Sequence, residues 1–168
     1  IKADILVSGG SLGAFATAIN AAKAAPDRLV VLTEPGIWLG GQATAQGVSA
    51  IDNAWFLPAS AWMKEDEPSF YAADWLEFLD RVRRKPCHAP GRGYGGDACS
   101  WVSRYAFDPR TGAWTLDQMA AEIPNLKVLY QTVVKKLSMN PAGTEIETVT
   151  LLQRKARKEF IPFSRHLS

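Results

Sequence analysis

The sequence predicts an α/β fold built on a parallel sheet. A short apolar run at residues 5–7 ends in glycines where an alanine-rich helix begins, and a second apolar run follows at 29–33. Continuous apolar runs are typical of parallel strands covered on both faces. A third run, 126–130, is followed by two further segments, 132–137 and 144–152, the second of which alternates apolar with polar residues; together they predict a hairpin. These segments indicate a Rossmann-like core with a small antiparallel insertion.

The turn after the first run has the composition of a phosphate-binding loop. Gly9, Gly10 and Gly13 let a ligand approach the backbone closely, and the first amides of the helix expected at 13–25 lack intrahelical acceptors. Those donors and the helix dipole favour a pyrophosphate. The strict G-x-G-x-x-G pattern keeps only its first glycine, because serine and alanine occupy the other two positions.

An acidic residue stands at the carboxyl end of the second run. Glu34 lies 25 residues after Gly9, close to the interval at which a dinucleotide-binding unit places the carboxylate that accepts from ribose hydroxyls. No arginine follows Glu34 to receive a 2′-phosphate, so NADP is disfavoured. The alternative is a glycine-rich turn that binds nothing, with Glu34 as a solvated loop acid.

A second glycine pair follows at Gly40 and Gly41. A flavin is larger than a nicotinamide, and a chain without Cβ atoms can pass beside the extended cofactor with its amides free. Gln42 and Thr44 add polar groups to this segment. The alternative is an ordinary flexible turn, because paired glycines are common in loops.

Residues 7–13 and 34–47 together resemble the FAD-dependent oxidoreductases whose amino terminus reads GG(T/S)xxG, then EP, then LGG and a loop of small residues. The group includes glutathione-reductase-like Rossmann flavoproteins and proteins described as xanthan-lyase-like. The resemblance covers about residues 3–60 closely and the remainder loosely. In that family serine commonly replaces the second glycine, so Ser11 fits the pattern.

The resemblance implies FAD as the cofactor. The turn would contact the pyrophosphate, Glu34 the adenosine ribose, and residues 40–42 the ribityl and flavin side. The hairpin would bring Val133 or Val134 near the adenine. The expected cofactor-binding residues are Gly9, Gly10, Ser11, Leu12, Gly13, Glu34, Pro35, Gly40, Gly41, Gln42, Val133 and Val134. No substrate is implied.

The middle of the chain, 51–125, is predicted to be a helical and loop-rich insertion between a first βαβ half, 1–50, and a closing segment, 126–168. Apolar residues at helical spacing over 71–84 indicate an amphipathic helix whose aromatic stripe packs in the core. A further helix-like segment is expected around 116–123.

Both cysteines lie in a glycine-rich segment, 85–103. In one interpretation Cys87 and Cys99 form a disulfide that closes this loop. The alternatives are two free thiols, a single redox cysteine, or a covalent flavin link through a cysteine or His88. Metal is not expected, since two cysteines and one nearby histidine match no zinc spacing. His88 and His166 otherwise resemble ordinary loop histidines.

No catalytic residue can be assigned from the sequence. By the resemblance, Arg104 and Tyr105 are candidates for a substrate-anion contact and a flavin wall. A surface arginine and a core tyrosine are the alternative. The chain contains no activated serine motif, and its carboxylates show no telling paired spacing.

Composition restricts the classes of protein. With 47% hydrophobic and 21% charged residues among 168, the chain is predicted to be globular. A net charge of +2 and a tail, 153–168, with few aromatic residues argue against nucleic-acid binding, and no apolar run is long enough for a membrane span. The chain starts at Ile1, so removal of a leader leaves both a cytoplasmic and an exported location open.

We therefore expect the amino-terminal part of an FAD-dependent oxidoreductase that acts on a small-molecule substrate. Three parallel strands leave a sheet edge uncovered, which predicts that the rest of the enzyme or a second chain completes the FAD site. The alternatives are an NAD-binding dehydrogenase or reductase domain and a non-catalytic dinucleotide-binding subunit.

Overall fold

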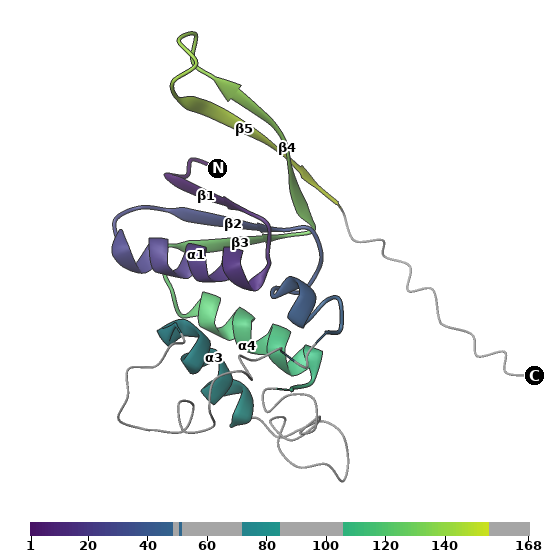
Figure 1. Ribbon diagram of the computed structural model, residues 1–168. Coiled ribbons are helices and arrows are strands. Elements are labelled where there is room, and N and C mark those ends of the chain that lie inside the picture. Colours follow the sequence, from purple (N-terminus) through teal and green to yellow (C-terminus); the bar gives the residue numbers. More distant parts are fainter. Residues whose placement is uncertain (49–50, 52–71, 85–105, 155–168) are drawn as a thin grey trace, which may run out of the picture.

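The computed structural model describes residues 1–48, 51, 72–84 and 106–154 (Figure 1). The expectations for Cys87, His88, Cys99, Arg104, Tyr105 and His166 lie outside the described residues.

A parallel three-stranded sheet forms the centre of the fold, in the order β1-β2-β3. The strands are β1 (Ile5–Ser8), β2 (Val30–Glu34) and β3 (Leu126–Tyr130). All five residues of the central strand β2 are buried, as its continuous apolar sequence predicts. Because the strands are parallel, their carboxyl ends meet at one edge of the sheet, where the glycine-rich turn also lies.

Two helices pack against one side of this sheet and a third lies beyond them, while a two-stranded hairpin rises on the other side (Figure 1). Helix α1 (Leu12–Ala24) joins β1 to β2 and buries Phe15, Ala18, Ile19 and Ala22, which recur at helical spacing. Helix α3 (Ala73–Arg83) packs against α4 (Pro109–Ala121). The predicted α/β class, with a parallel sheet and a small antiparallel pair, is confirmed.

Helix α4 begins seven residues before the segment expected from periodicity. Asp108 is its N-cap, with Oδ1 accepting from the amides of Arg110 at 2.7 Å and Thr111 at 3.4 Å. Pro109 occupies the first helical position, where a missing amide hydrogen costs nothing. The Asp-Pro pair was therefore a helix-start signal that the sequence analysis did not use.

The aromatic stripe of α3 packs in the core, as predicted. Phe78 is 2% exposed and meets the ring of Phe107 edge-on at a centroid distance of 5.3 Å. Trp75 stacks on Phe78 at 5.5 Å. These contacts join α3 to the segment that leads into α4.

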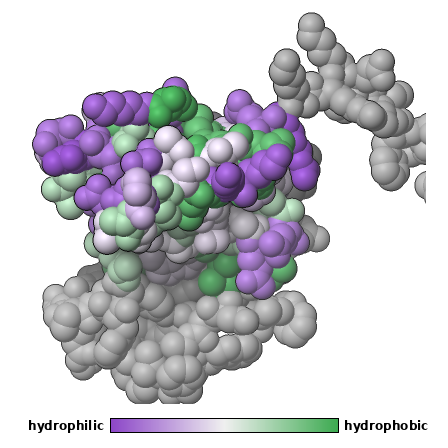
Figure 2. Space-filling view, turned by 90° about the horizontal axis from the view of Figure 1, so that it is seen from above, coloured by the Kyte–Doolittle hydropathy of each residue, from purple (hydrophilic) through white to green (hydrophobic). Residues whose placement is uncertain are grey.

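The hairpin consists of β4 (Thr132–Met139) and β5 (Ile146–Gln153), paired antiparallel with irregularities near Lys136 and Met139. Seen from above in the orientation of Figure 1, this part of the surface mixes hydrophobic and hydrophilic residues (Figure 2). No helix within the described ranges is long and apolar enough to cross a membrane.

Candidate functional site

The glycine-rich turn between β1 and α1 is shaped by two glycines with different tasks. Gly9 has φ +105°, a conformation that side chains disfavour, and its amide donates to Thr33 Oγ1 at 3.2 Å. A Cβ at Gly9 would meet no atom within 4 Å, so the backbone is open to a ligand there. A Cβ at Gly10, in contrast, would lie 1.7 Å from Oε2 of Glu34. The Glu34 carboxyl group thus occupies the space that a side chain at residue 10 would need.

The amino end of α1 supplies hydrogen-bond donors beside this turn. Ser11 Oγ accepts from the amide of Ala14 at 3.2 Å, and the Ser11 carbonyl accepts from Phe15 at 2.8 Å. Ser11 is therefore the helix N-cap, a task that its assignment as a phosphate contact did not include. Helix geometry leaves the amides of Leu12 and Gly13 without intrahelical acceptors, and a pyrophosphate is the kind of group that such amides bind.

The second glycine pair lies directly against the first. The Gly40 amide donates to the Gly10 carbonyl at 2.7 Å, and Gly40 forms a parallel bridge with Ser11. Gly40 and Gly41 both have positive φ, +106° and +55°, at the start of a short 3-10 helix, η1 (Gly41–Ala43). A Cβ on Gly41 would approach Ser11 Cα to 3.3 Å, so glycine also permits this close passage.

A pocket of about 360 Å³ opens between the two glycine segments. This volume lies at the lower end of the range for small-molecule sites. The residues that line it are Ser11, Leu12, Gly13, Gly40, Gln42, Ala43, Val48 and Ile51. Five of the eight are predicted cofactor residues, whereas Ala43, Val48 and Ile51 add an apolar wall that the sequence analysis did not foresee.

Glu34 ends β2 beside the turn and is only 6% exposed. Burial raises the pKa of its carboxyl group, while a hydrogen bond from the Gly36 amide to Oε1, at 2.5 Å, acts in the opposite direction. Pro35 follows as an exposed residue. Glu34 thus lies next to Gly10 and accepts from the Gly36 amide, while its contact with an adenosine ribose stays a prediction.

Tyr130, at the end of β3, is the register partner of Glu34 and was not singled out in the sequence. Its hydroxyl donates to the carboxylate of Asp117 on α4. Burial, the hydrogen bond to Asp117 and the nearby Glu34 charge raise the pKa of Tyr130, so this group stays a neutral donor. The pair ties α4 to the strand beside Glu34.

Val133 and Val134 do not line the pocket. They lie near the start of β4, where Val133 is 39% exposed and Val134 is partly buried. The connection to the rest of the site runs through Gln131, whose amide donates to the Gly36 carbonyl at 2.8 Å. The two valines therefore closely follow a residue that is hydrogen-bonded near Glu34, and they are separate from the glycine pocket.

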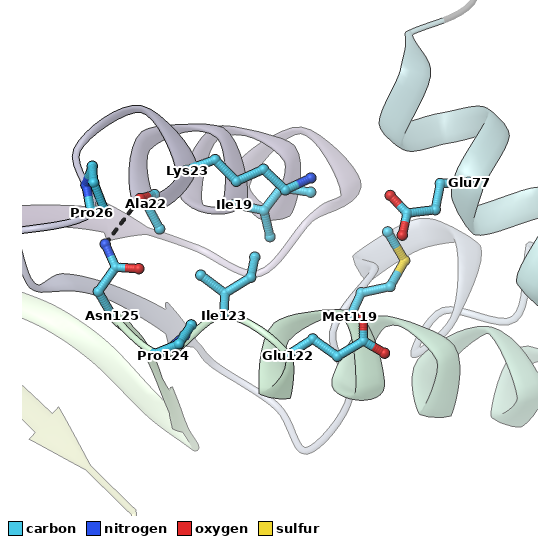
Figure 3. Close-up of a pocket in the computed structure, with 10 residues that line it drawn as sticks. All are labelled: Ile19, Ala22, Lys23, Pro26, Glu77, Met119, Glu122, Ile123, Pro124 and Asn125. Carbon is cyan, nitrogen blue, oxygen red and sulfur yellow. Dashed lines mark hydrogen bonds between the residues drawn. The ribbon is translucent and has the colours of Figure 1, made fainter.

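A second pocket, also of about 360 Å³, lies at the other end of α1 (Figure 3). Its floor is apolar, with Ile19, Met119 and Ile123, and Lys23, Glu77 and Glu122 stand around it. Asn125 caps α1 there by donating to the Ala22 carbonyl at 2.9 Å. This pocket borders the second half of α1, from Ile19 onward, whereas the glycine turn lies at the amino end of the helix.

No group of three metal-binding side chains occurs among the residues that the structure describes.

The parallel sheet, the glycine turn at the amino end of α1 and the acid that ends β2 define a dinucleotide-binding α/β protein. The family model described as FAD dependent oxidoreductase matches residues 4–161. The chain therefore belongs to the FAD-dependent oxidoreductase family, and its cofactor is FAD.

One solved structure that is similar to this chain is the p-nitrophenol 4-monooxygenase PnpA from Pseudomonas putida DLL-E4, with 14% sequence identity and a TM-score of 0.41. The match covers 83% of this chain and 34% of that chain, so the chain spans about a third of the length of that enzyme. No curated protein sequence matches the chain.

Proposed function

We propose that residues 1–168 form the FAD-binding, amino-terminal part of an oxidoreductase that acts on a small-molecule substrate. The observation that carries this proposal is the hydrogen bond between Gly40 and Gly10, which joins the two glycine segments around one pocket. A glycine turn that bound nothing would not require a second glycine segment, with positive φ at Gly40 and Gly41, to return against it.

The pocket and the residues around it suit successive parts of FAD. The free amides of Leu12 and Gly13 bind the pyrophosphate, helped by the open backbone at Gly9. Glu34 accepts from the adenosine ribose beside Gly10, and its neighbour Pro35 borders the same group.

Gly40, Gly41 and Gln42 pass beside the ribityl chain and the flavin, with Gln42 lining the pocket. Val133 and Val134 border the adenine, on the side that Gln131 connects to Gly36. FAD supplies hydride or electron transfer at its flavin ring. The residues of this chain bind and orient the cofactor, and Val48 and Ile51 give one wall of the pocket an apolar surface.

We also propose that further polypeptide completes the site, as a continuation of this chain or as a second chain. In the described sheet, β1 and β3 are the outer strands, and each leaves one row of backbone groups for another element. The three segments 1–50, 51–125 and 126–168 would then be the first βαβ half, an insertion and the closing part of the FAD-binding domain. We further propose that this chain belongs to the glutathione-reductase-like or xanthan-lyase-like group within the family.

The test is the identity of the cofactor that the full-length natural protein retains. Purified without added cofactor, the protein should show the visible absorption of flavin and release FAD on denaturation. Release of NAD without visible absorption would favour a dehydrogenase or reductase domain instead. A protein that carries no nucleotide and binds none when FAD is added would contradict the proposal.

A further inference from the structure

Thr44 is a buried threonine whose hydroxyl points away from the pocket. It is 1% exposed and does not line the pocket. Its Oγ1 donates to the Leu39 carbonyl at 2.5 Å, so the polar group that the sequence seemed to offer to a ligand is used inside the protein.

This hydrogen bond holds the peptide unit between Leu39 and Gly40. The carbonyl of that unit accepts from Thr44, while its amide, which belongs to Gly40, donates to the Gly10 carbonyl at 2.7 Å. A peptide unit is planar, so its carbonyl and amide turn together. Thr44 therefore fixes the orientation of the same unit that attaches the second glycine segment to the first.

The methyl group of Thr44 fills a space left by two glycines. A Cβ on Gly40 would lie 2.7 Å from Thr44 Cγ2 and 2.8 Å from Leu116 Cδ1. A Cβ on Gly112, in the first turns of α4, would lie 3.2 Å from the same methyl group. Thr44 is thus packed between the glycine segment and α4, which Figure 1 shows below η1.

We propose that Thr44 is a positioning residue whose hydroxyl group sets the flavin-side half of the cofactor site, residues 40–42, by holding the peptide unit before Gly40, while its methyl group packs against α4 and contributes to stability. The inference rests on the proposed function. The pyrophosphate donors at Leu12 and Gly13 belong to α1, which has its own cap at Ser11, so we expect Thr44 to act mainly on the flavin-side half.

Threonine is suited to this position because it combines a donor and a methyl group. Valine keeps the volume but leaves the carbonyl of fully buried Leu39 without its partner. Serine keeps the donor but leaves a void between Gly40 and Gly112. The two substitutions therefore separate the hydrogen bond from the packing.

The experiment compares the affinities of the full-length protein for FAD and for ADP, which lacks the ribityl and flavin groups. Thr44→Val should weaken FAD binding about tenfold and ADP binding less than about twofold. Thr44→Ser should lower the unfolding temperature and keep the ratio of the two affinities near that of the wild type. Thr115→Val is the matched control, since Thr115 is fully buried and its hydroxyl donates to the Thr111 carbonyl at 2.8 Å, within α4. It should leave the ratio unchanged.

Equal losses of FAD and ADP affinity in Thr44→Val, or no loss of either, would overturn the inference. If Thr44→Val does not fold, Thr44→Ser is the deciding variant. It keeps the hydroxyl donor, so a changed ratio of FAD to ADP affinity in this variant would contradict the role assigned to Thr44. Failure of the wild-type protein to bind FAD would refute the proposed function. Because this measurement uses no variant, it is distinct from a failure of the inference about Thr44.

Discussion

The contact between Gly10 and Glu34 predicts that substitutions at these two positions are strongly non-additive. In Gly10→Ala the new Cβ would lie 1.7 Å from Glu34 Oε2, 2.7 Å from its Cδ and 3.0 Å from its Cβ. The carboxyl group must leave this place and its hydrogen bond from the Gly36 amide. Gly10 is not among the positive-φ glycines, so the cost comes from overpacking and not from the backbone. We expect a loss of about 1–3 kcal/mol in the free energy of unfolding.

The Glu34→Ala background tests this reason. It removes the two closest atoms and keeps only the Cβ contact at 3.0 Å, which a small shift can relieve. Adding Gly10→Ala there should cost about 0.5 kcal/mol, which leaves a coupling energy of about 0.5–2.5 kcal/mol between the two sites. Denaturant unfolding of the four proteins of the cycle measures it.

Gly13→Ala is the control for the added methyl group, because its Cβ would meet only Ser11 Oγ, at 3.9 Å. Its stability should stay within about 0.5 kcal/mol of the wild type. If Gly10→Ala cost the same with and without the Glu34 carboxyl group, the reasoning from this contact would be refuted.

Two further predictions concern Glu34 and Asp108. Burial raises the folded-state pKa of Glu34 above its ordinary value of 4.5. The folded protein therefore binds more protons than the unfolded chain in that interval, and stability falls as pH rises from 4.5 through the raised pKa. Glu34→Gln should remove this part of the pH dependence, as followed by unfolding at a series of pH values; an unchanged slope would show that another group causes it. Asp108→Ala should lower stability by about 1 kcal/mol through loss of the α4 N-cap, whereas Asp108→Asn should retain most of it. Equal thermal shifts in both Asp108 variants would argue against capping as the cause.

The order β1, glycine turn, α1, β2 and the terminal acid was readable in the sequence, because each depends on neighbours in the chain. Burial on both faces produces continuous apolar strands, and helical burial recurs at the spacing of Phe15 and Ile19. The boundaries were less predictable. The start of α4 depended on the Asp108 cap and not on apolar periodicity.

The tertiary structure alone decided what each glycine is for. Sequence motifs grouped Gly9, Gly10 and Gly40 as ligand contacts. In the fold, Gly9 is open to approach, Gly10 makes room for Glu34, and Gly40 makes room for Thr44 and Leu116. The absence of a side chain has a meaning only through the atom that takes its place. At Gly10 that atom belongs to Glu34, and at Gly40 one of the neighbours is Leu116, both far along the chain, so only long-range packing could show which way these glycines face.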